Sequence, residues 1–291
     1  MILFILACGS DQNLDVWTWG EEHPTTEYSY EDLQKPLALI PYQGGMLVSD
    51  ESLQSIVFLQ DGEQTIVAET LPSPSEIIIH NDSVYFTTES TIEQLFVEDN
   101  SSTTIIDGLV SPKRIIMHNE LLFWIEEGSL YYWDDGQFLA ICSELSTPYD
   151  IIEWKDSLWI TTQGDNGLWN LENDECTLME TLDDIPHRMT VDDDTLWITT
   201  RSFRWPYGGW IVSYDGETTK HIESPPEPEH ITTWNGHVIW SSKQSITSYE
   251  QIPYSMLAAQ TTVGDMLIHD DVLYWSDLHG GRIGSIILAE Q

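Results

Sequence analysis

The chain has 291 residues, of which 41% are apolar, and its 13 Trp, 12 Tyr and 7 Phe are enough for a large hydrophobic core. It carries 49 acidic and 10 basic residues, for a formal net charge of −39. A chain of this charge repels nucleic acid and anionic membrane surfaces, which excludes nucleic-acid binding. The acidity itself is typical of a highly soluble protein or of adaptation to a salty habitat.

Residues 1–8 are an apolar segment that ends at Cys8 and is too short to span a bilayer. Residues 5–8 (Ile-Leu-Ala-Cys) resemble the bacterial lipobox, in which the cysteine is lipidated and becomes the mature N-terminus. The match lacks a basic segment before the apolar run, and a chance apolar start is the alternative. We expect residues 1–8 to be a lipoprotein signal segment with Cys8 as the lipidation site, and residues 9–25 to be a tether.

From residue 26 onward one pattern recurs: an opening proline or turn, an apolar run, a polar tight turn, and a second apolar run rich in aromatic and β-branched residues. The stretch 74–88 shows it clearly. The first apolar residues after the tight turn are Met46, Val84, Leu122, Leu158, Leu196, Val238 and Leu273. Their intervals of 38, 38, 36, 38, 42 and 35 residues indicate a propeller or a solenoid.

Each copy holds four short β runs, which in the second copy are 77–80, 84–88, 92–97 and 103–106. Asp-Gly pairs at 61–62, 135–136 and 215–216 fall between third and fourth runs, where a tight hairpin needs positive φ. The sequence therefore predicts an all-β, seven-bladed β-propeller of four-stranded antiparallel blades, one domain over 26–291. The last repeat has room for three strands only, so we predict that residues 26–30 supply its fourth strand and close the ring.

Leu273-Tyr274-Trp275-Ser276-Asp277 resembles the YWTD motif of lipoprotein-receptor propellers. Residues 84–88, 122–126, 158–162 and 196–200 are looser versions, and the repeat is also similar to those of bacterial exported YWTD-like and NHL-like proteins. The resemblance covers about 36–285 and implies an architecture, not an activity. That receptor family has six repeats, so six blades is the alternative count.

The position two residues after each opening proline, or its equivalent, comes directly before an apolar first strand, and should lie at the upper mouth of the central channel. Six of the seven side chains are ionisable: Glu76, Arg114, Asp150, Arg188, His230 and Asp265, with Ala38 in the first copy. They form either a self-neutralising ring in a wet channel or a ligand site. Carboxylates and an imidazole would hold Ca²⁺ or a similar ion, whereas the two Arg favour an anionic or mixed ligand.

The longest interval contains residues 201–210, an insertion between second and third strands at the same face. Its Arg201, Arg204, Trp205 and Tyr207 are typical of binding hot spots for protein or sugar partners. The alternative is that its aromatic residues fold back over the blade. Eight of the ten basic residues map to this face, where they either steer anionic partners or neutralise acidic loops.

Cys142 and Cys176 lie at similar positions in neighbouring repeats. In an oxidising compartment they would pair only if the outer strands of two adjacent blades come close together, and the sequence leaves both outcomes open. No CxxC pair or His/Cys cluster indicates a structural zinc site.

The sequence contains no GxSxG, HExxH, P-loop or Rossmann motif. We interpret the chain as a non-enzymatic, monomeric binding module that takes a protein or a small polar or anionic ligand through its top face, without a cofactor. We place it in the bacterial cell envelope, at the outer membrane, in the periplasm or on the cell surface, held at the membrane only by an N-terminal lipid.

The alternative function is a divalent-metal-dependent lactonase, other hydrolase or lyase. Gluconolactonase-like and streptogramin-lyase-like propellers are the enzymes that the repeat resembles in architecture, and they carry acidic or His residues around a central divalent ion. The resemblance implies Glu76, Asp150, His230 and Asp265 as candidate metal ligands and Arg188 as the group that polarises a carbonyl.

Overall fold

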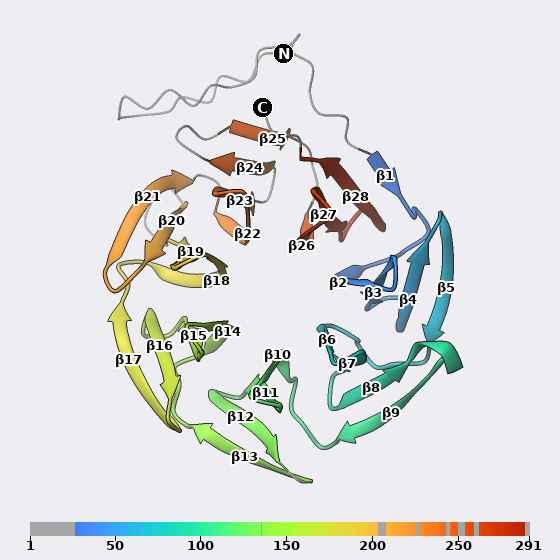
Figure 1. Ribbon diagram of the computed structural model, residues 1–291, viewed down its shortest axis with the longest axis horizontal. Helices are drawn as coiled ribbons and strands as arrows, with labels where there is room; N and C mark the ends of the chain where they lie inside the picture. The colour runs from blue at the N-terminus through green and yellow to red at the C-terminus, as the bar shows by residue number, and fades with distance from the viewer. Residues whose placement is uncertain are drawn as a thin grey trace.

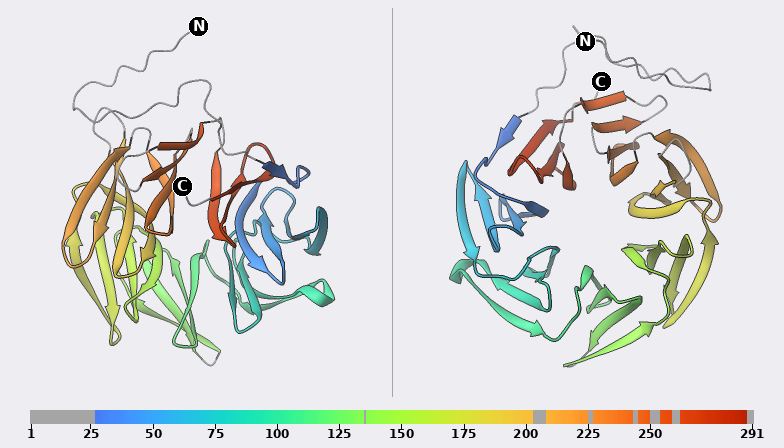
Figure 2. Two further views of the ribbon diagram at one scale, coloured as in Figure 1. Left: turned by 45° about the horizontal axis from the view of Figure 1, so that its top comes forward. Right: turned by 180° about the vertical axis from the view of Figure 1, so that it is seen from behind.

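A computed structural model of the chain describes residues 27–134, 136–202, 208–224, 227–242, 245–249, 254–258 and 262–288. Its strands form seven four-stranded antiparallel sheets, arranged as blades around a central opening (Figures 1 and 2). The predicted seven-bladed β-propeller is confirmed, and the six-blade alternative is wrong. Within the described ranges the one helix is the short 3-10 turn η1 (Val97–Asp99), and no helix there has the length and apolar character that would cross a membrane.

Blades 1 to 3 each run along the chain from the innermost strand to the outermost. Blade 1 is β2 (Pro36–Tyr42), β3 (Gly45–Asp50), β4 (Ser55–Gln60) and β5 (Glu63–Ala68). Blade 2 is β6 (Ile77–His80), β7 (Ser83–Thr87), β8 (Ile92–Phe96) and β9 (Ser101–Ile106). Blade 3 is β10 (Lys113–His118), β11 (Leu121–Glu126), β12 (Ser129–Asp134) and β13 (Gln137–Cys142).

Blades 4 to 6 repeat this order. Blade 4 is β14 (Pro148–Trp154), β15 (Ser157–Thr162), β16 (Gly167–Glu172) and β17 (Glu175–Thr181). Blade 5 is β18 (Ile185–Asp192), β19 (Thr195–Arg201), β20 (Gly209–Tyr214) and β21 (Thr218–Ser224). Blade 6 is β22 (Pro228–Trp234), β23 (His237–Ser242), β24 (Ser245–Tyr249) and β25 (Tyr254–Ala258).

Blade 7 is built from both ends of the chain. It contains β26 (Val263–His269), β27 (Val272–Asp277), β28 (Arg282–Ile287) and, outermost, β1 (Glu27–Ser29). β1 pairs antiparallel with β28, with Glu27 opposite Ser285. The Tyr28 ring lies edge-on to Trp275 at 6.1 Å, and the Arg282 guanidinium carbon lies 3.6 Å from the centre of the Tyr28 ring. The predicted closure of the ring by the N-terminal run is therefore confirmed.

The hairpins close through tight turns of the kind that the sequence predicts. Asp61 and Gly62 join β4 to β5 with φ of 51° and 83°, and Asn81 and Asp82 join β6 to β7 with φ of 48° and 62°. Two successive positive φ values define the turn that matches the twist of paired strands, and Asn, Asp and Gly tolerate them best. Short polar turns therefore hold each strand pair in register.

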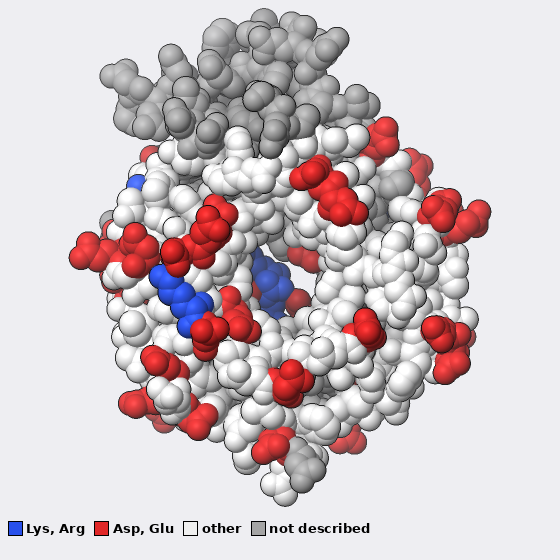
Figure 3. Space-filling view, in the orientation of Figure 1, with Lys and Arg blue, Asp and Glu red and all other residues white. Residues whose placement is uncertain are grey.

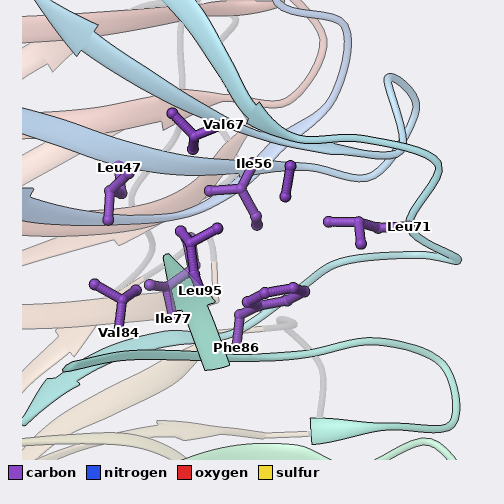
Figure 4. Close-up of a cluster of buried hydrophobic side chains, with 10 residues drawn as sticks. Leu47, Ile56, Val67, Leu71, Ile77, Val84, Phe86 and Leu95 are labelled. Atoms are coloured by element: carbon purple, nitrogen blue, oxygen red, sulfur yellow. The ribbon is translucent and has the colours of Figure 1, made fainter. Parts of the chain in front are cut away.

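The hydrophobic core lies between neighbouring blades. Figure 4 shows side chains from blade 1, among them Leu47 and Ile56, directed toward Val84 and Phe86 of blade 2. All four are at most 1% exposed. The same arrangement recurs around the ring and buries the large aromatic residues of the second strands, such as Trp124, Trp240 and Trp275. The stability of each blade therefore depends on its neighbours.

The structure shows that Cys142 and Cys176 are paired, which the sequence left open. Cys142, at the end of β13, forms a disulfide with Cys176 on β17, and their Cα atoms are 5.8 Å apart. The bond joins the outer strands of blades 3 and 4. These strands therefore come closer than a simple splayed arrangement would allow.

Removing this disulfide should cost about 3–4 kcal/mol of unfolding free energy, because it closes a loop of 34 residues in the unfolded chain. Urea unfolding of the Cys142→Ser/Cys176→Ser double variant measures this cost. The natural chain with reductant should unfold at the same urea concentration as the variant. Equal stability of oxidised chain and variant would contradict the prediction.

Candidate functional site

We call the seven residues predicted at the channel mouth the ring residues: Ala38, Glu76, Arg114, Asp150, Arg188, His230 and Asp265. A repeated hydrogen bond fixes the backbone of most of them. In six of the seven blades the backbone N–H of the ring residue donates to a Ser or Thr hydroxyl eleven residues later, on the second strand. The pairs are Ala38–Ser49, Glu76–Thr87, Asp150–Thr161, Arg188–Thr199, His230–Ser241 and Asp265–Ser276, at 2.9 to 3.2 Å. Every one of these hydroxyl residues is 0% exposed. The ring side chains therefore start from equivalent places on a rigid support.

Several of these hydroxyls also connect one blade to the next. Thr161 donates to the carbonyl of His187 at 2.8 Å, and Ser276 donates to that of Leu37 at 3.0 Å. The second contact joins the last blade to the first. Each acceptor belongs to the residue just before the next ring position, so neighbouring ring side chains are spaced by the same contact.

Thr161→Val should lower the free energy of unfolding by about 2 kcal/mol, because it leaves a buried N–H and a buried carbonyl without partners while keeping the side-chain volume. Chemical unfolding measures this loss. Thr103→Val on the exposed outer strand β9 is the control and should change stability by less than about 0.5 kcal/mol. Equal effects of the two changes would show that the hydroxyl contributes nothing.

Blade 3 departs from this pattern. Ile125 occupies the position of the hydroxyl, and Arg114 has a φ of +48°, a conformation that costs energy for any residue other than glycine. The Arg114 guanidinium reaches both ways around the ring, with Nε bonded to Asp150 and Nη1 to Glu76 at 2.8 Å. The charges of Asp150 and Glu76 outweigh the effect of burial and raise the pKa of Arg114, which stays cationic. Such local strain is typical of functional positions.

Asp150 contacts both Arg114 and Arg188 and is 1% exposed. It accepts the backbone N–H of Met189 at 2.7 Å, which ties blade 4 to blade 5. Its other oxygen lies 3.6 Å from Nη1 of Arg188. Both carboxylate oxygens of Asp150 are therefore used by contacts within the protein. Asp150 orients the two arginines and is not itself available to a ligand.

Arg188 has N–H donors that form no hydrogen bond within the described part of the chain. Its Nε and Nη1 are buried and have no hydrogen-bond partner among the described residues. The guanidinium carbon lies 5.5 Å from the centre of the Tyr149 ring, which in turn stacks on His187 at 4.7 Å. The guanidinium is thus held by an aromatic ring and a distant carboxylate, with N–H donors left over.

Asp265 and His230 meet on the other side of the ring. Asp265 accepts the N–H groups of Met266 at 2.9 Å and of Leu39 in blade 1 at 3.2 Å, and its Oδ1 lies 3.9 Å from Nδ1 of His230. Burial and the charge of Glu76 raise the pKa of Asp265 to about 7. Burial, with Arg114, lowers the pKa of His230 to about 3, so its imidazole is neutral.

The raised pKa of Asp265 makes stability depend on pH. Its contribution to the unfolding free energy is full below the pKa of an unfolded Asp, about 3.9, and is lost as the pH rises through 7. Between pH 5 and pH 8, the unfolding free energy of Asp265→Asn relative to that of the natural chain should therefore rise by about 2–3 kcal/mol. Urea unfolding at both values measures the gain, and Asp156→Asn in an exposed turn is the control. His230 has the opposite sign, because its lowered pKa makes its contribution full above about 6.5 and lost as the pH falls.

Five of the seven ring residues line a cavity of about 500 Å³ at the channel mouth, namely Ala38, Glu76, Arg114, Arg188 and Asp265, and Tyr149 lines it too. Figure 3 shows a hollow at the centre of the molecule, with basic side chains inside it and acidic side chains over the surrounding face. The structure thus brings Glu76, Arg114, Asp150 and Arg188 into one contact network. Tyr149 was not expected from the sequence, although it directly precedes a ring residue.

The four candidate metal ligands do not converge on one point. In the part of the chain that the structure describes, no three His, Cys, Asp or Glu side chains are grouped so as to hold a metal ion. Glu76 and Asp150 are bonded to Arg114, and His230 lies 3.9 Å from Asp265. A central ion would require these side chains to rearrange.

Three basic residues of the top face are paired with nearby acidic residues outside the ring. Lys35 pairs with Glu51, Arg201 with Glu227 at 2.8 Å, and Arg282 with Asp277 at 3.1 Å. These pairs favour the interpretation that the basic residues neutralise nearby acidic residues over the interpretation that they steer anionic partners toward the face. Arg201 ends strand β19, whereas the predicted loop residues Arg204, Trp205 and Tyr207 lie outside the described residues.

No family model matches the chain, and no curated protein matches its sequence. Among solved structures it is similar to a streptogramin B lyase, with a TM-score of 0.74 at 15% identity over 92% of this chain and 98% of that one. It is also similar to a gluconolactonase from Xanthomonas campestris, with a TM-score of 0.56 at 12% identity, covering 91% and 89% of the two chains.

Two further similar structures are proteins of other kinds. One is the extracellular domain assigned to a one-component system of B. thetaiotaomicron, with a TM-score of 0.74 at 10% identity, covering 91% of this chain and 40% of that one. The other is a computationally designed protein, with a TM-score of 0.66 at 9% identity, covering 89% and 98%. Likeness at such identities shows the propeller fold alone. The resemblance to YWTD and NHL repeats stays a prediction.

Proposed function

We propose that this chain is an exported, lipid-anchored propeller that binds a small carboxylate-bearing ligand at its channel mouth, without catalysis. The observation that carries the proposal is Arg188, whose buried Nε and Nη1 have no hydrogen-bond partner among the described residues and which lines a cavity of about 500 Å³. Leaving charged donors buried and unsatisfied is costly. A ligand carboxylate would accept from them, and Arg binds carboxylates through paired bonds.

Arg114 and Asp150 support the same function. Asp150 holds Arg114 and lies close to Arg188, so both guanidinium groups are oriented before a ligand arrives. Orienting groups in advance lowers the entropic cost of binding. A Ser or Thr in place of Ile125 would give blade 3 the same hydrogen bond as the other blades. The chain instead has a strained backbone at Arg114, and such strain is typical of residues that bind a ligand.

Export and lipid anchoring are supported by the lipobox-like residues 5–8 and by the disulfide, since disulfides persist in oxidising compartments. Cys8→Ser should release the protein from the membrane fraction into the soluble fraction. Residues 201–210 remain our proposed contact for a protein partner, and an Arg201/Arg204/Trp205 triple alanine variant in pull-downs tests it.

The ligand proposal is tested on the full chain with Cys8→Ser, by thermal unfolding with acetate, succinate and citrate at constant ionic strength. At least one carboxylate should raise the midpoint, because a ligand that binds only the folded state stabilises it. Arg188→Gln should abolish the rise, whereas Lys155→Gln in a turn of blade 4 should not. The proposal is wrong if no carboxylate raises the midpoint, or if Arg188→Gln responds like the natural chain.

The same experiment bears on the metal-dependent hydrolase or lyase. A midpoint that falls with EDTA and recovers with Ca²⁺, Zn²⁺ or Mn²⁺, but not in the His230→Ala variant, would support that alternative. It would also mean that the ring side chains rearrange around the ion.

A further inference from the structure

The cavity at the channel mouth is divided into a basic and an acidic half. Its basic lining residues are Lys113 and Arg114 of blade 3 and Arg188 of blade 5. Its acidic lining residues come from blades 7, 1 and 2, which follow one another around the ring: Asp265, Glu51, Glu76 and Glu89. Opposite charges therefore face each other across one cavity.

Each half keeps groups that a ligand can use. On the basic side, the buried Nε and Nη1 of Arg188 form no hydrogen bond to any described residue, although Nη1 lies 3.6 Å from Asp150. The exposed Lys113 forms no ion pair with any described residue. On the acidic side, Glu76 bonds Arg114 through Oε2, and its Oε1 has no bond to any described side chain. Glu89 is exposed and its carboxylate is likewise unpaired within the described residues. Glu51 differs, because Lys35 neutralises it.

We infer that the ligand of this site is a zwitterion, namely a free α-amino acid or a dipeptide, with its carboxylate on Arg188 and its ammonium group on the Glu76 side. This inference rests on the proposed function and adds the ammonium group to it. A ligand with only negative charge would bring its anion near the exposed Glu89 and the unpaired Oε1 of Glu76, and like charges repel. A ligand with only positive charge would meet the arginines.

The size of the cavity agrees with this class of ligand. A volume of about 500 Å³ lies within the range of small-molecule sites. The Tyr149 ring at the basic end offers an apolar surface beside the guanidinium, on which the ligand's carbon atoms would pack. Recognition of both charges would make the zwitterion bind more tightly than the simple carboxylates that Arg188 alone accepts.

The test compares three probes by titration calorimetry on the full chain with Cys8→Ser: L-alanyl-L-alanine, its N-acetyl form and its C-terminal amide. The free dipeptide should bind about tenfold more tightly than either blocked form, since each block removes one charge-assisted contact. Arg188→Gln should weaken the free and acetylated forms alike. Glu76→Gln/Glu89→Gln should weaken binding of the free dipeptide and should not weaken binding of the acetylated form, which loses only a like-charge repulsion.

Glu120→Gln/Glu153→Gln, in other strands and turns of blades 3 and 4, is the matched control and should leave all three affinities unchanged. Thermal unfolding of each variant confirms that it is folded. Equal binding of free and acetylated dipeptide would overturn the zwitterion and leave the carboxylate site intact. Binding of a simple carboxylate with no binding of the dipeptide would do the same. Binding of the amide alone, or of no probe and no carboxylate, would overturn both proposals.

Discussion

Replacing Asp150 with alanine should lower the free energy of unfolding by about 3–5 kcal/mol, the usual cost of removing one partner from a buried ion pair. Asp150 is 1% exposed, bonds Arg114 and lies 3.6 Å from Arg188. Without it, two guanidinium groups at the centre of the ring lose their shared counter-charge. The backbone N–H of Met189 also loses its acceptor. Urea unfolding monitored by Trp fluorescence measures the loss.

Asp265→Ala is the matched control for this prediction. Asp265 occupies the same ring position and accepts the same kind of backbone N–H from the next blade, that of Leu39. No arginine ion pair with Asp265 is present among the described residues. The loss in Asp150→Ala should therefore exceed the loss in Asp265→Ala by about 2 kcal/mol or more. Similar losses would show that the blade-to-blade hydrogen bond matters and the arginine pairs do not.

Asp150→Asn separates the two roles further. The amide oxygen still accepts the N–H of Met189, but the negative charge is gone. Stability should fall less than in Asp150→Ala. Carboxylate binding should still weaken, because Arg188 is no longer oriented by a buried charge.

The sequence predicts the fold well because each repeat carries its own local signals. Tight-turn residues such as Asp61 and Gly62, and the opening prolines, fix strand order and register without long-range information. Register alone also placed the ring residues around one channel. The supporting hydroxyls, Ser49 in the first blade and Thr161 in the fourth, stand at a constant spacing in the sequence. This spacing is therefore a signal for the ring position that can be read from the sequence.

The pairing of side chains within the ring needed the structure. Arg114 and Asp150 are 36 residues apart, and no local pattern says which neighbour a ring arginine will contact. The positive φ of Arg114 turns its side chain between two carboxylates, and this depends on the three-dimensional course of blade 3. The same holds for the disulfide, because the separation of two outer strands depends on how far adjacent blades splay.

A chain that starts at Glu31 should be less stable than the natural chain by about 3–4 kcal/mol, because it lacks the strand that closes the ring. Its loss includes burial of Tyr28 against Trp275, about 2 kcal/mol, and the contact with Arg282, about 0.5–1 kcal/mol. The backbone hydrogen bonds between β1 and β28 add to this. The outer edge of β28 would then be free to pair with other chains, so the truncated protein should also aggregate on heating.

A chain that starts at Glu27 is the control, because it keeps β1 and lacks everything before it. Its unfolding midpoint should match that of the natural chain, and light scattering should show a monomer. Tyr28→Ala in the otherwise intact chain should show an intermediate stability, since the backbone of β1 still covers the edge of β28. If the chains that start at Glu27 and at Glu31 unfold at the same urea concentration, β1 pairs with β28 without stabilising the ring. The three strands contributed by the C-terminal end would then suffice to close the propeller.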